Sequence, residues 1–245
     1  MFLKSNKIVL DFYTHRQDVY DYARPLESKH FIPDWWKSLE SQIQQPGHFA
    51  PNATMRHCKG FLDQFTSGVM IPMWTDFLFE TSKIGTNEYR WEFADGMSKG
   101  VVHEQMLRGG FLKQEEYSHL KILVPWIIEC SQPDLKWILQ QPTWKMQDIP
   151  YVTPSGIVTF EYQHSCHTNL FAIKKKDSAS KFMIEAGQPL LQMIPMSMDK
   201  IEIRSHVISK EEYDRKSASS VQTSFVRKYA THIRLKDFYE NNSNS

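Results

Sequence analysis

The chain has 245 residues, of which 41% are hydrophobic and 13% aromatic, so it can bury a substantial core. Its 29 Lys and Arg residues nearly balance 28 Asp and Glu residues, and the formal charge of +1 excludes a global attraction to nucleic acid or to an anionic membrane. The three cysteines, Cys58, Cys130 and Cys166, form no Cys-x-x-Cys pair, which argues against a disulfide framework or a zinc ribbon.

Hydropathy gives no sign of a membrane span or a secretory signal. The longest apolar run, residues 122–128, is shorter than the ~20 residues that a membrane-spanning helix needs, and Pro125 interrupts it. Near the N-terminus, Ile8-Val9-Leu10 is too short an apolar stretch for a secretory signal. We therefore expect a protein that stays inside the cell and makes no contact with a membrane.

The first 27 residues combine a strand with a short helix. Residues 7–13 alternate in polarity and contain β-branched side chains, which predicts a strand. Thr14-His15-Arg16-Gln17 has the spacing of a capping box and predicts the start of a helix, which Pro25 would end.

Two further helices are predicted before residue 69, with an irregular segment between them. Pro-Asp-Trp-Trp-Lys at residues 33–37 predicts a helix start, where we expect one tryptophan to pack and the other to remain half exposed. Residues 42–54 are rich in Gln, Pro, Gly and Asn, lack periodicity and are interpreted as a connecting segment. Apolar residues at helical spacing then predict an amphipathic helix over residues 56–66 that ends near Gly68.

From Val69 onward the hydrophobic period changes to two, which is typical of β-strands. Residues 77–79 and 89–93 predict a hairpin with a turn near residues 85–87. Further strands are expected at residues 119–124, 126–130, 135–140, 156–173, 181–185, 190–196 and 200–208. Pro and Gly, rather than long helices, separate these strands. We therefore predict a mainly β fold, an antiparallel barrel or jelly-roll-like sandwich with a few short helices, mostly N-terminal.

No internal repeat or linker divides the chain, so residues 1–245 are interpreted as a single β-rich domain. Its parts are a mixed N-terminal region (1–68), a β core (69–208) and a C-terminal helix with a polar tail (209–245). Ser209-Lys210-Glu211-Glu212 supplies a capping box for that last helix.

The densest group of polar side chains lies in the predicted strand over residues 156–173. Strand alternation places Tyr162, His164 and Cys166 on its apolar face. One interpretation is a hydrogen-bonded core histidine. The other is that these three residues form the wall of a small-ligand pocket inside a barrel.

Metal binding by the histidines is a weaker hypothesis. His164 and His167 are three residues apart, so on a strand they point to opposite faces and cannot chelate as a pair. His164 would need His103 or His119 from a neighbouring strand, as in cupin-type barrels.

Catalytic and cofactor motifs are absent from the sequence. It contains no Gly-x-Gly-x-x-Gly, phosphate loop, His-Glu-x-x-His or Gly-x-Ser-x-Gly motif. We therefore expect no cofactor, and enzyme activity is disfavoured.

Basic and aromatic residues bear on possible partners. Lys174-Lys175-Lys176 is typical of a solvated turn, and no nucleic-acid recognition module surrounds it, which disfavours nucleic-acid binding. Tryptophans at strand and loop edges are typical of protein interfaces. The candidate interface residues are Trp35, Trp36, Trp74, Trp126 and Trp144. Protein partners are therefore expected, and self-association is compatible with exposed β edges.

Four segments distributed over most of the chain carry a family resemblance: Asp11-Phe12-Tyr13, His30 to Lys37, Pro142-Thr143-Trp144 and Gly187-Gln188-Pro189. In these segments the sequence resembles a family of uncharacterised proteins encoded by tailed phages of marine cyanobacteria. The resemblance implies a phage origin, a location in the host cytoplasm or the virion, and other virion proteins as partners. It implies no particular mechanism.

A second resemblance covers residues 156–196. Gly156 to Tyr162 and Ile184 to Gln192 are similar to paired strand motifs of the trimeric dUTPase and dCTP deaminase barrel. Thr159 occupies the position of that superfamily's catalytic aspartate and cannot act as a base at neutral pH. This resemblance implies a barrel fold without the reaction.

Together these observations favour a non-catalytic, phage-encoded module that binds protein or builds the virion. The alternative is a small-ligand or metal-binding barrel enzyme, either cupin-like or a degenerate dUTPase-like protein.

Overall fold

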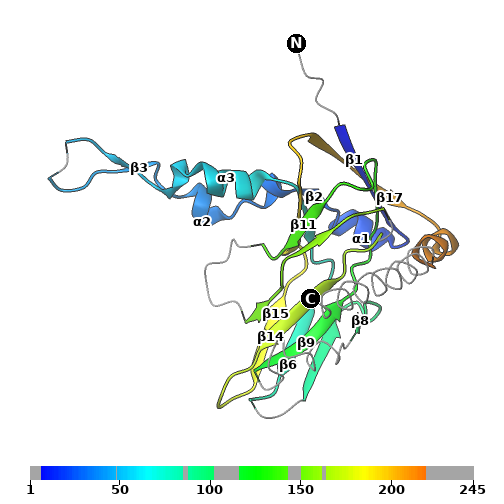
Figure 1. Ribbon diagram of the computed structural model, residues 1–245. Helices are drawn as coiled ribbons and strands as arrows, with labels where there is room; N and C mark the ends of the chain where they lie inside the picture. Colours follow the sequence, from blue (N-terminus) through cyan, green and yellow to red (C-terminus); the bar gives the residue numbers. More distant parts are fainter. Residues whose placement is uncertain are drawn as a thin grey trace, which may run out of the picture.

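The computed structural model describes residues 7–47, 49–84, 88–101, 116–142, 150–161 and 164–218. The fold is mainly β, with several sheets packed as a sandwich and an arm that projects from one side (Figure 1). The three-stranded sheet β10-β1-β17 consists of Ile127–Cys130, Lys7–Thr14 and Lys200–Val207. The five-stranded sheet β13-β11-β16-β5-β2 consists of Gly156–Val158, Trp137–Gln140, Pro189–Pro195, Val69–Pro72 and Leu26–Glu27.

Two more sheets form the other end of the sandwich, and a small ribbon belongs to the arm. The four-stranded sheet β12-β14-β9-β8 consists of Tyr151–Val152, Thr168–Ile173, Tyr117–Ile122 and Gly100–Val101. The sheet β15-β6-β7 consists of Ser180–Ile184, Phe77–Thr81 and Tyr89–Phe93. The ribbon pairs β3 (Gln42–Ile43) with β4 (Asn52–Ala53).

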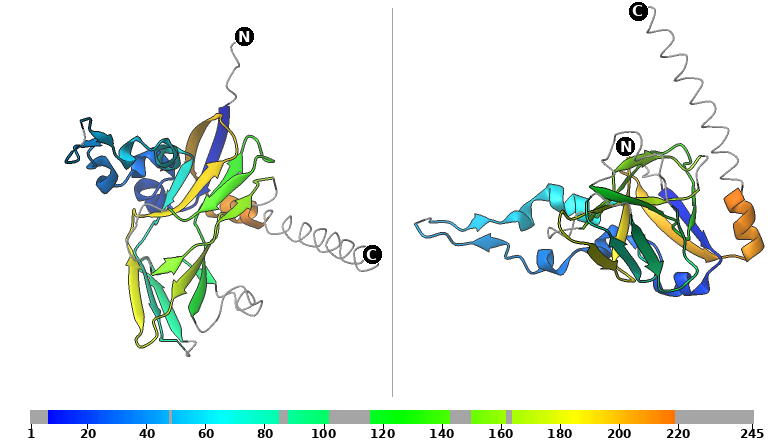
Figure 2. Two further views of the ribbon diagram at one scale, coloured as in Figure 1. Left: turned by 60° about the vertical axis from the view of Figure 1, so that its left-hand side comes forward. Right: turned by 90° about the horizontal axis from the view of Figure 1, so that it is seen from below.

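Helices are short. They are α1 (Gln17–Tyr22), α2 (Asp34–Lys37) and α3 (Lys59–Thr66), with the 3₁₀ turns η1 (Ser28–Phe31) and η2 (Met55–His57). A further helix covers 210–218, on the side of the sandwich away from the arm (Figure 2). Its start is capped as predicted, because the Glu212 N–H donates to Ser209 Oγ at 3.1 Å.

One hydrophobic core connects the four main sheets. It includes Leu10 of β1, Ile71 of β5, Phe79 of β6 and Leu170 of β14, all with no exposed area. The two sheets at the far end also touch directly, since the Tyr89 hydroxyl donates to the His119 carbonyl oxygen at 3.2 Å. The predicted mainly β, sandwich-like architecture is confirmed.

The pairing of β1 with β17 departs from the predicted antiparallel arrangement. These strands run parallel, in register from Lys7 opposite Lys200 to Thr14 opposite Val207. The other strand pairs within the described ranges are antiparallel. β1 lies at the centre of its sheet, so this N-terminal strand is part of the β core.

The polar strand predicted over residues 156–173 is not continuous. β13 ends at Val158, a turn follows at 160–161, and β14 begins at Thr168. The reason is that the chain leaves the sheet containing β11 and joins the one containing β9. By contrast, the predicted hairpin of β6 and β7 is confirmed, with Phe79 opposite Trp91.

A polar cluster joins the start of α1 to the turn after β7. Arg16 Nη1 lies 2.6 Å from Asp95 Oδ2, and both side chains are about nine-tenths buried. The Ser98 hydroxyl donates to the same carboxylate oxygen at 2.6 Å and accepts a hydrogen bond from Trp74 Nε1 at 2.6 Å. Burial alone would raise the pKa of Asp95. Hydrogen bonds from the Ser98 side chain and backbone, from Arg16 and from the Met97 N–H nevertheless lower that pKa to about 2.

This cluster predicts a pH-dependent stability. The pKa of Asp95 in the folded chain lies below its ordinary value of 3.8, so the unfolded chain binds the proton first as the pH falls. The stabilisation is complete above about pH 4 and is lost as the pH approaches about 2. We expect Asp95→Asn to lower the free energy of unfolding by about 2 kcal/mol at pH 7 and by much less near pH 2.5, as measured by urea unfolding.

Asp63→Asn is the matched control, because Asp63 pairs with Lys59 on the exposed surface of α3. It should change stability by less than about 0.5 kcal/mol. A difference between wild type and Asp95→Asn that stays constant down to pH 2.5 would contradict the assignment.

Candidate protein-binding arm

Residues 32–67, here called the arm, extend sideways from the sandwich (Figures 1 and 2). The chain leaves through α2, turns back through the β3–β4 ribbon and returns through η2 and α3. α2 and α3 form the base of the arm, and the ribbon forms its outer part (Figure 1).

Aromatic packing holds the base of the arm together. The rings of Trp36 and Phe65 lie 4.8 Å apart in an edge-to-face arrangement, and Phe61 packs 5.7 Å from Trp36. Both Trp36 and Phe65 also belong to a small buried cluster with Met70 of β5. This cluster is separate from the main core, so the base of the arm has a hydrophobic core of its own.

Strand β5 connects the two cores. Val69 and Ile71 face the main core, whereas Met70 points the other way, into the arm cluster. All four residues of β5 are buried as a result. The arm therefore covers the outer face of a strand that would otherwise expose a methionine.

Hydrogen bonds across the ribbon define the direction of the outer arm. Gln42 pairs with Ala53 and Ile43 with Asn52. Thr54 N donates to the Ser41 carbonyl oxygen at 3.1 Å, and Arg56 Nη1 donates to the Leu39 carbonyl oxygen at 2.8 Å. The two halves of the arm are thus joined from Leu39 outward.

The outer arm buries almost none of its own surface. Every described residue from 40 to 60 is exposed except Thr54, which is half-buried. Phe49 shows 108% relative exposure and Ile43 shows 50%. Pro46 and Gly47 form the turn between the strands, and the φ of +84° at Gly47 explains why glycine stands there. An isolated two-stranded ribbon is marginally stable in water.

Charged residues balance over the arm as a whole, but its outer part carries one unbalanced positive charge. Residues 41–62 contain no Asp or Glu; Lys59 is paired with Asp63, whereas Arg56 has no acidic residue within this stretch. Exposed apolar side chains of Ile43, Phe49 and Met55 lie within the same stretch. The outer arm therefore combines apolar groups with net positive charge.

Gln192 of β16 fastens the arm to the sandwich. Its side chain has no exposed area. Nε2 donates to the carbonyl oxygens of Gln64 at 2.8 Å and Ser67 at 3.0 Å, at the end of α3. Oε1 accepts a hydrogen bond from Gln140 Nε2 at 2.9 Å, within the same sheet. One buried amide thus links the returning chain of the arm to two strands.

Gly68 permits the close approach that this link requires. Its φ is +77°, and a Cβ atom built there would lie 1.9 Å from the Met193 carbonyl oxygen. No other residue fits this position without movement of the backbone. The Gly68 carbonyl oxygen also accepts a hydrogen bond from Ser28 N at 3.1 Å, where the chain enters the arm.

The tryptophans predicted as interface residues fall into different environments. Trp126 is fully buried, and Trp74 is buried with its N–H bonded to Ser98, so both belong to the main core. Trp36 is buried in the arm cluster, and Trp35 is half-buried beside it, as expected for the pair. Trp144 lies outside the described residues.

Two of the three residues predicted to line a ligand pocket, His164 and Cys166, lie within the described residues. Cys166 is buried, with its Sγ atom 4.0 Å from Met193 Sδ, and burial raises the pKa of its thiol. His164 Nδ1 lies 3.0 Å from the Ile128 carbonyl oxygen. Tyr162 lies outside the described residues, so the predicted three-residue wall stays a prediction.

The candidate metal ligands do not form a cluster where they are described. His119 is buried on β9, with its ring stacked 4.4 Å from Phe171 and its Nε2 atom 3.1 Å from Asn169 Oδ1. His103 lies outside the described residues. Within the described part of the chain, no group of three or more His, Cys, Asp or Glu side chains could hold a metal ion.

Residues 42–54 are predicted from the sequence as a connecting segment, because strands of two residues are too short to produce a periodic pattern. Two features of the sequence nevertheless indicate a turn and an exposed surface here. Pro46-Gly47 is a turn dipeptide, and the stretch around it lacks acidic residues.

Comparison of the chain with protein-family models, with curated proteins and with solved structures found no significant match. Among the residues described, none of the helices has the length and apolar character needed to cross a membrane.

We expect the chain to lose much of its stability when the hydrogen bonds of the Gln192 side chain are removed. Gln192→Met keeps similar volume but leaves two partly buried carbonyl oxygens and the Gln140 amide without this partner. We expect the free energy of unfolding to fall by about 2–4 kcal/mol, as measured by chemical denaturation.

Gln17→Met serves as the control, because the Gln17 amide donates to Asp21 at 3.0 Å on the exposed surface of α1. It should change stability by no more than about 0.5 kcal/mol. Equal losses in the two variants would refute the role given to Gln192.

Proposed function

We propose that this chain is a non-catalytic protein-binding module that docks onto its partner through the arm. The observation that carries the proposal is the outer arm itself, a defined ribbon with Phe49 and Ile43 exposed at and near its turn. Exposed apolar groups on a structured projection are typical of binding surfaces. Burial of a phenylalanine side chain contributes roughly 1.5–3 kcal/mol, so docking would stabilise the ribbon.

The composition of the arm indicates the chemistry of the partner. The apolar side chains fit a hydrophobic pocket or groove, with Phe49 as the central anchor. Arg56 lies in a stretch without acidic residues, between 41 and 62, which favours a partner with an acidic rim. Such a rim would accelerate association and make it sensitive to salt.

The firm base of the arm supports this proposal. Gln192 and the cluster around Trp36 fix the direction in which the arm leaves the sandwich. A binding element held in place loses less conformational entropy when it docks. The sandwich acts in this proposal as the scaffold that presents the arm.

The phage resemblance suggests where the module acts. We propose that the partner is another phage protein, in the virion or during infection in the host cytoplasm. Docking of the arm onto a second copy of the chain would be seen as a concentration-dependent change in mass.

A photo-crosslinking experiment tests the arm directly. A photoreactive phenylalanine analogue is placed at position 49 and, in a separate protein, at position 198. Met198 is an equally exposed apolar residue (101%), in the turn between β16 and β17 and outside the arm. In infected cells we expect one dominant adduct from position 49 and none from position 198. The same adducts from both positions, or no adduct from position 49, would contradict the proposal.

The recovered partner then allows a measurement of affinity. We expect Phe49→Ser to weaken binding by about 10- to 100-fold, because the anchor ring is lost. Met198→Ser should leave affinity unchanged, and both variants should unfold at the wild-type temperature. Unchanged binding by Phe49→Ser would show that the arm is not the docking element.

A further inference from the structure

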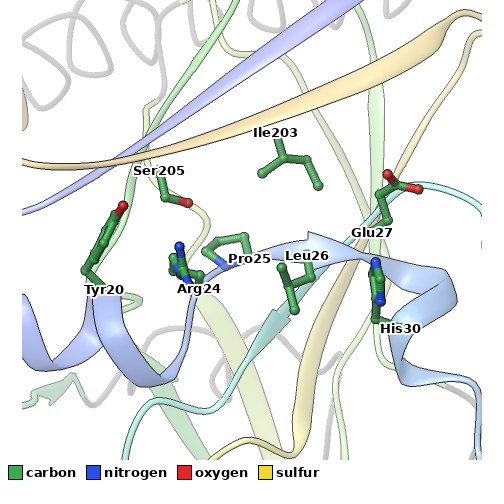
Figure 3. A pocket seen from close by; sticks show the side chains of 8 residues that line it. All are labelled: Tyr20, Arg24, Pro25, Leu26, Glu27, His30, Ile203 and Ser205. Carbon is green, nitrogen blue, oxygen red and sulfur yellow. The ribbon is translucent and has the colours of Figure 1, made fainter.

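A cleft of about 330 Å³ lies at the root of the arm, where two sheet edges face each other (Figure 3). Within the described residues, β2 is the last strand of the five-stranded sheet and β17 is the last strand of the three-stranded sheet. No ladder joins these two strands. The cleft is lined by Tyr20, Arg24, Pro25, Leu26, Glu27, His30, Ile203 and Ser205.

The two ends of the cleft are polar. Tyr20, Arg24 and Ser205 lie at one end, and Glu27 and His30 lie at the other (Figure 3). Ile203 and Ser205 share the face of β17 that continues the buried face of β1, because Ile203 pairs with Leu10 and Ser205 with Phe12. The cleft therefore borders the buried face of this sheet and opens to solvent beside Arg24, Leu26 and His30, which are exposed.

Arg24 is the main charge in the cleft. Its guanidinium carbon lies 5.0 Å from the centre of the Tyr20 ring, which orients the planar group. The structure gives Arg24 no carboxylate partner among the described residues. The acidic lining residue, Glu27, is already paired with Lys29 at 2.5 Å. The positive charge of Arg24 is thus not neutralised inside the cleft.

The middle of the cleft is apolar. Pro25 and Leu26 form one side and Ile203 the opposite side (Figure 3). The volume is near the lower end of the range for small-molecule sites, roughly 300–1,000 Å³. A ligand the size of one aromatic ring with one charged group matches that space.

We propose that this cleft binds a small anion with a compact apolar body, its head group a carboxylate or a phosphate. Arg24 holds the head group at the end where the Tyr20 and Ser205 hydroxyls are available as donors. A guanidinium binds such oxygens through two parallel hydrogen bonds, the geometry for which it is best suited. Pro25, Leu26 and Ile203 cover the apolar body.

Binding there would connect parts of the fold that no ladder joins. The ligand would touch β2 and η1, which lead into the arm, and β17 of the other sheet. A ligand that binds only the folded chain raises the free energy of unfolding by RT ln(1 + L/Kd), where L is the free ligand concentration, so its effect grows with that concentration. This site is independent of the docking role proposed for the outer arm.

Calorimetric titration of the full chain tests the proposal with four probes: benzoate, phenyl phosphate, inorganic phosphate and benzyl alcohol. We expect benzoate or phenyl phosphate to bind, and the tighter of the two identifies the head group. Benzyl alcohol lacks the charge and should not bind. Inorganic phosphate binding as tightly as phenyl phosphate would overturn the apolar part of the proposal, and no binding by either aromatic anion would overturn all of it.

Two arginine variants locate the site. Arg24→Gln should weaken binding of the preferred anion by about 10- to 100-fold, the effect expected for loss of a charge-assisted hydrogen bond. Arg204→Gln is the matched control, because Arg204 lies on the opposite face of β17 and pairs with Glu202 at 3.0 Å. Equal affinities in Arg24→Gln and wild type, with both proteins folded by thermal unfolding, would refute the assignment.

Discussion

The buried amide of Gln192 is the contact on which the arm depends. It accepts from Gln140 and donates to Gln64 and Ser67, so both ends of its side chain are satisfied away from water. A buried polar group of this kind is stable only in one geometry, because an unmatched donor or acceptor costs about 1–3 kcal/mol. Apolar contacts between Met70 and the aromatic cluster stabilise the packing of the arm on the sandwich, whereas the directional hydrogen bonds of Gln192 fix its orientation. Together these contacts hold a protruding segment in one orientation.

In this arrangement the residues that stabilise the fold are different from the residues that form the exposed outer arm. The large core under β1, β5 and β6 supplies the stability of the fold, and the arm has only a small cluster at its base. The outer ribbon contributes exposed surface rather than burial. Substitutions in the ribbon should therefore change the stability of the fold less than substitutions at the base of the arm.

Local patterns predicted much of the fold because they act over a few residues. The alternation around Phe79 and Trp91 predicted a hairpin, and the capping box at Ser209 predicted a helix start. Long-range relations were not predictable in this way. Nothing in β1 indicates a parallel partner near residue 200, and nothing near 159 marks the change of sheet. The arm is not predictable because its two-residue strands produce no periodic pattern, and the role of Gln192 depends on carbonyl groups that are distant in the sequence.

The pairing of β1 with β17 has a consequence for how the chain folds. During synthesis, residues 7–14 must remain without their parallel neighbour until residues 200–207 have been made. The arm and the β6–β7 hairpin close contacts between nearby residues, so they can form much earlier. β10 can pair with one edge of β1 earlier, but the edge that takes β17 stays open until the last strand is made. The central strand of one sheet is thus left with an unpaired edge for most of synthesis, and such an edge favours premature association.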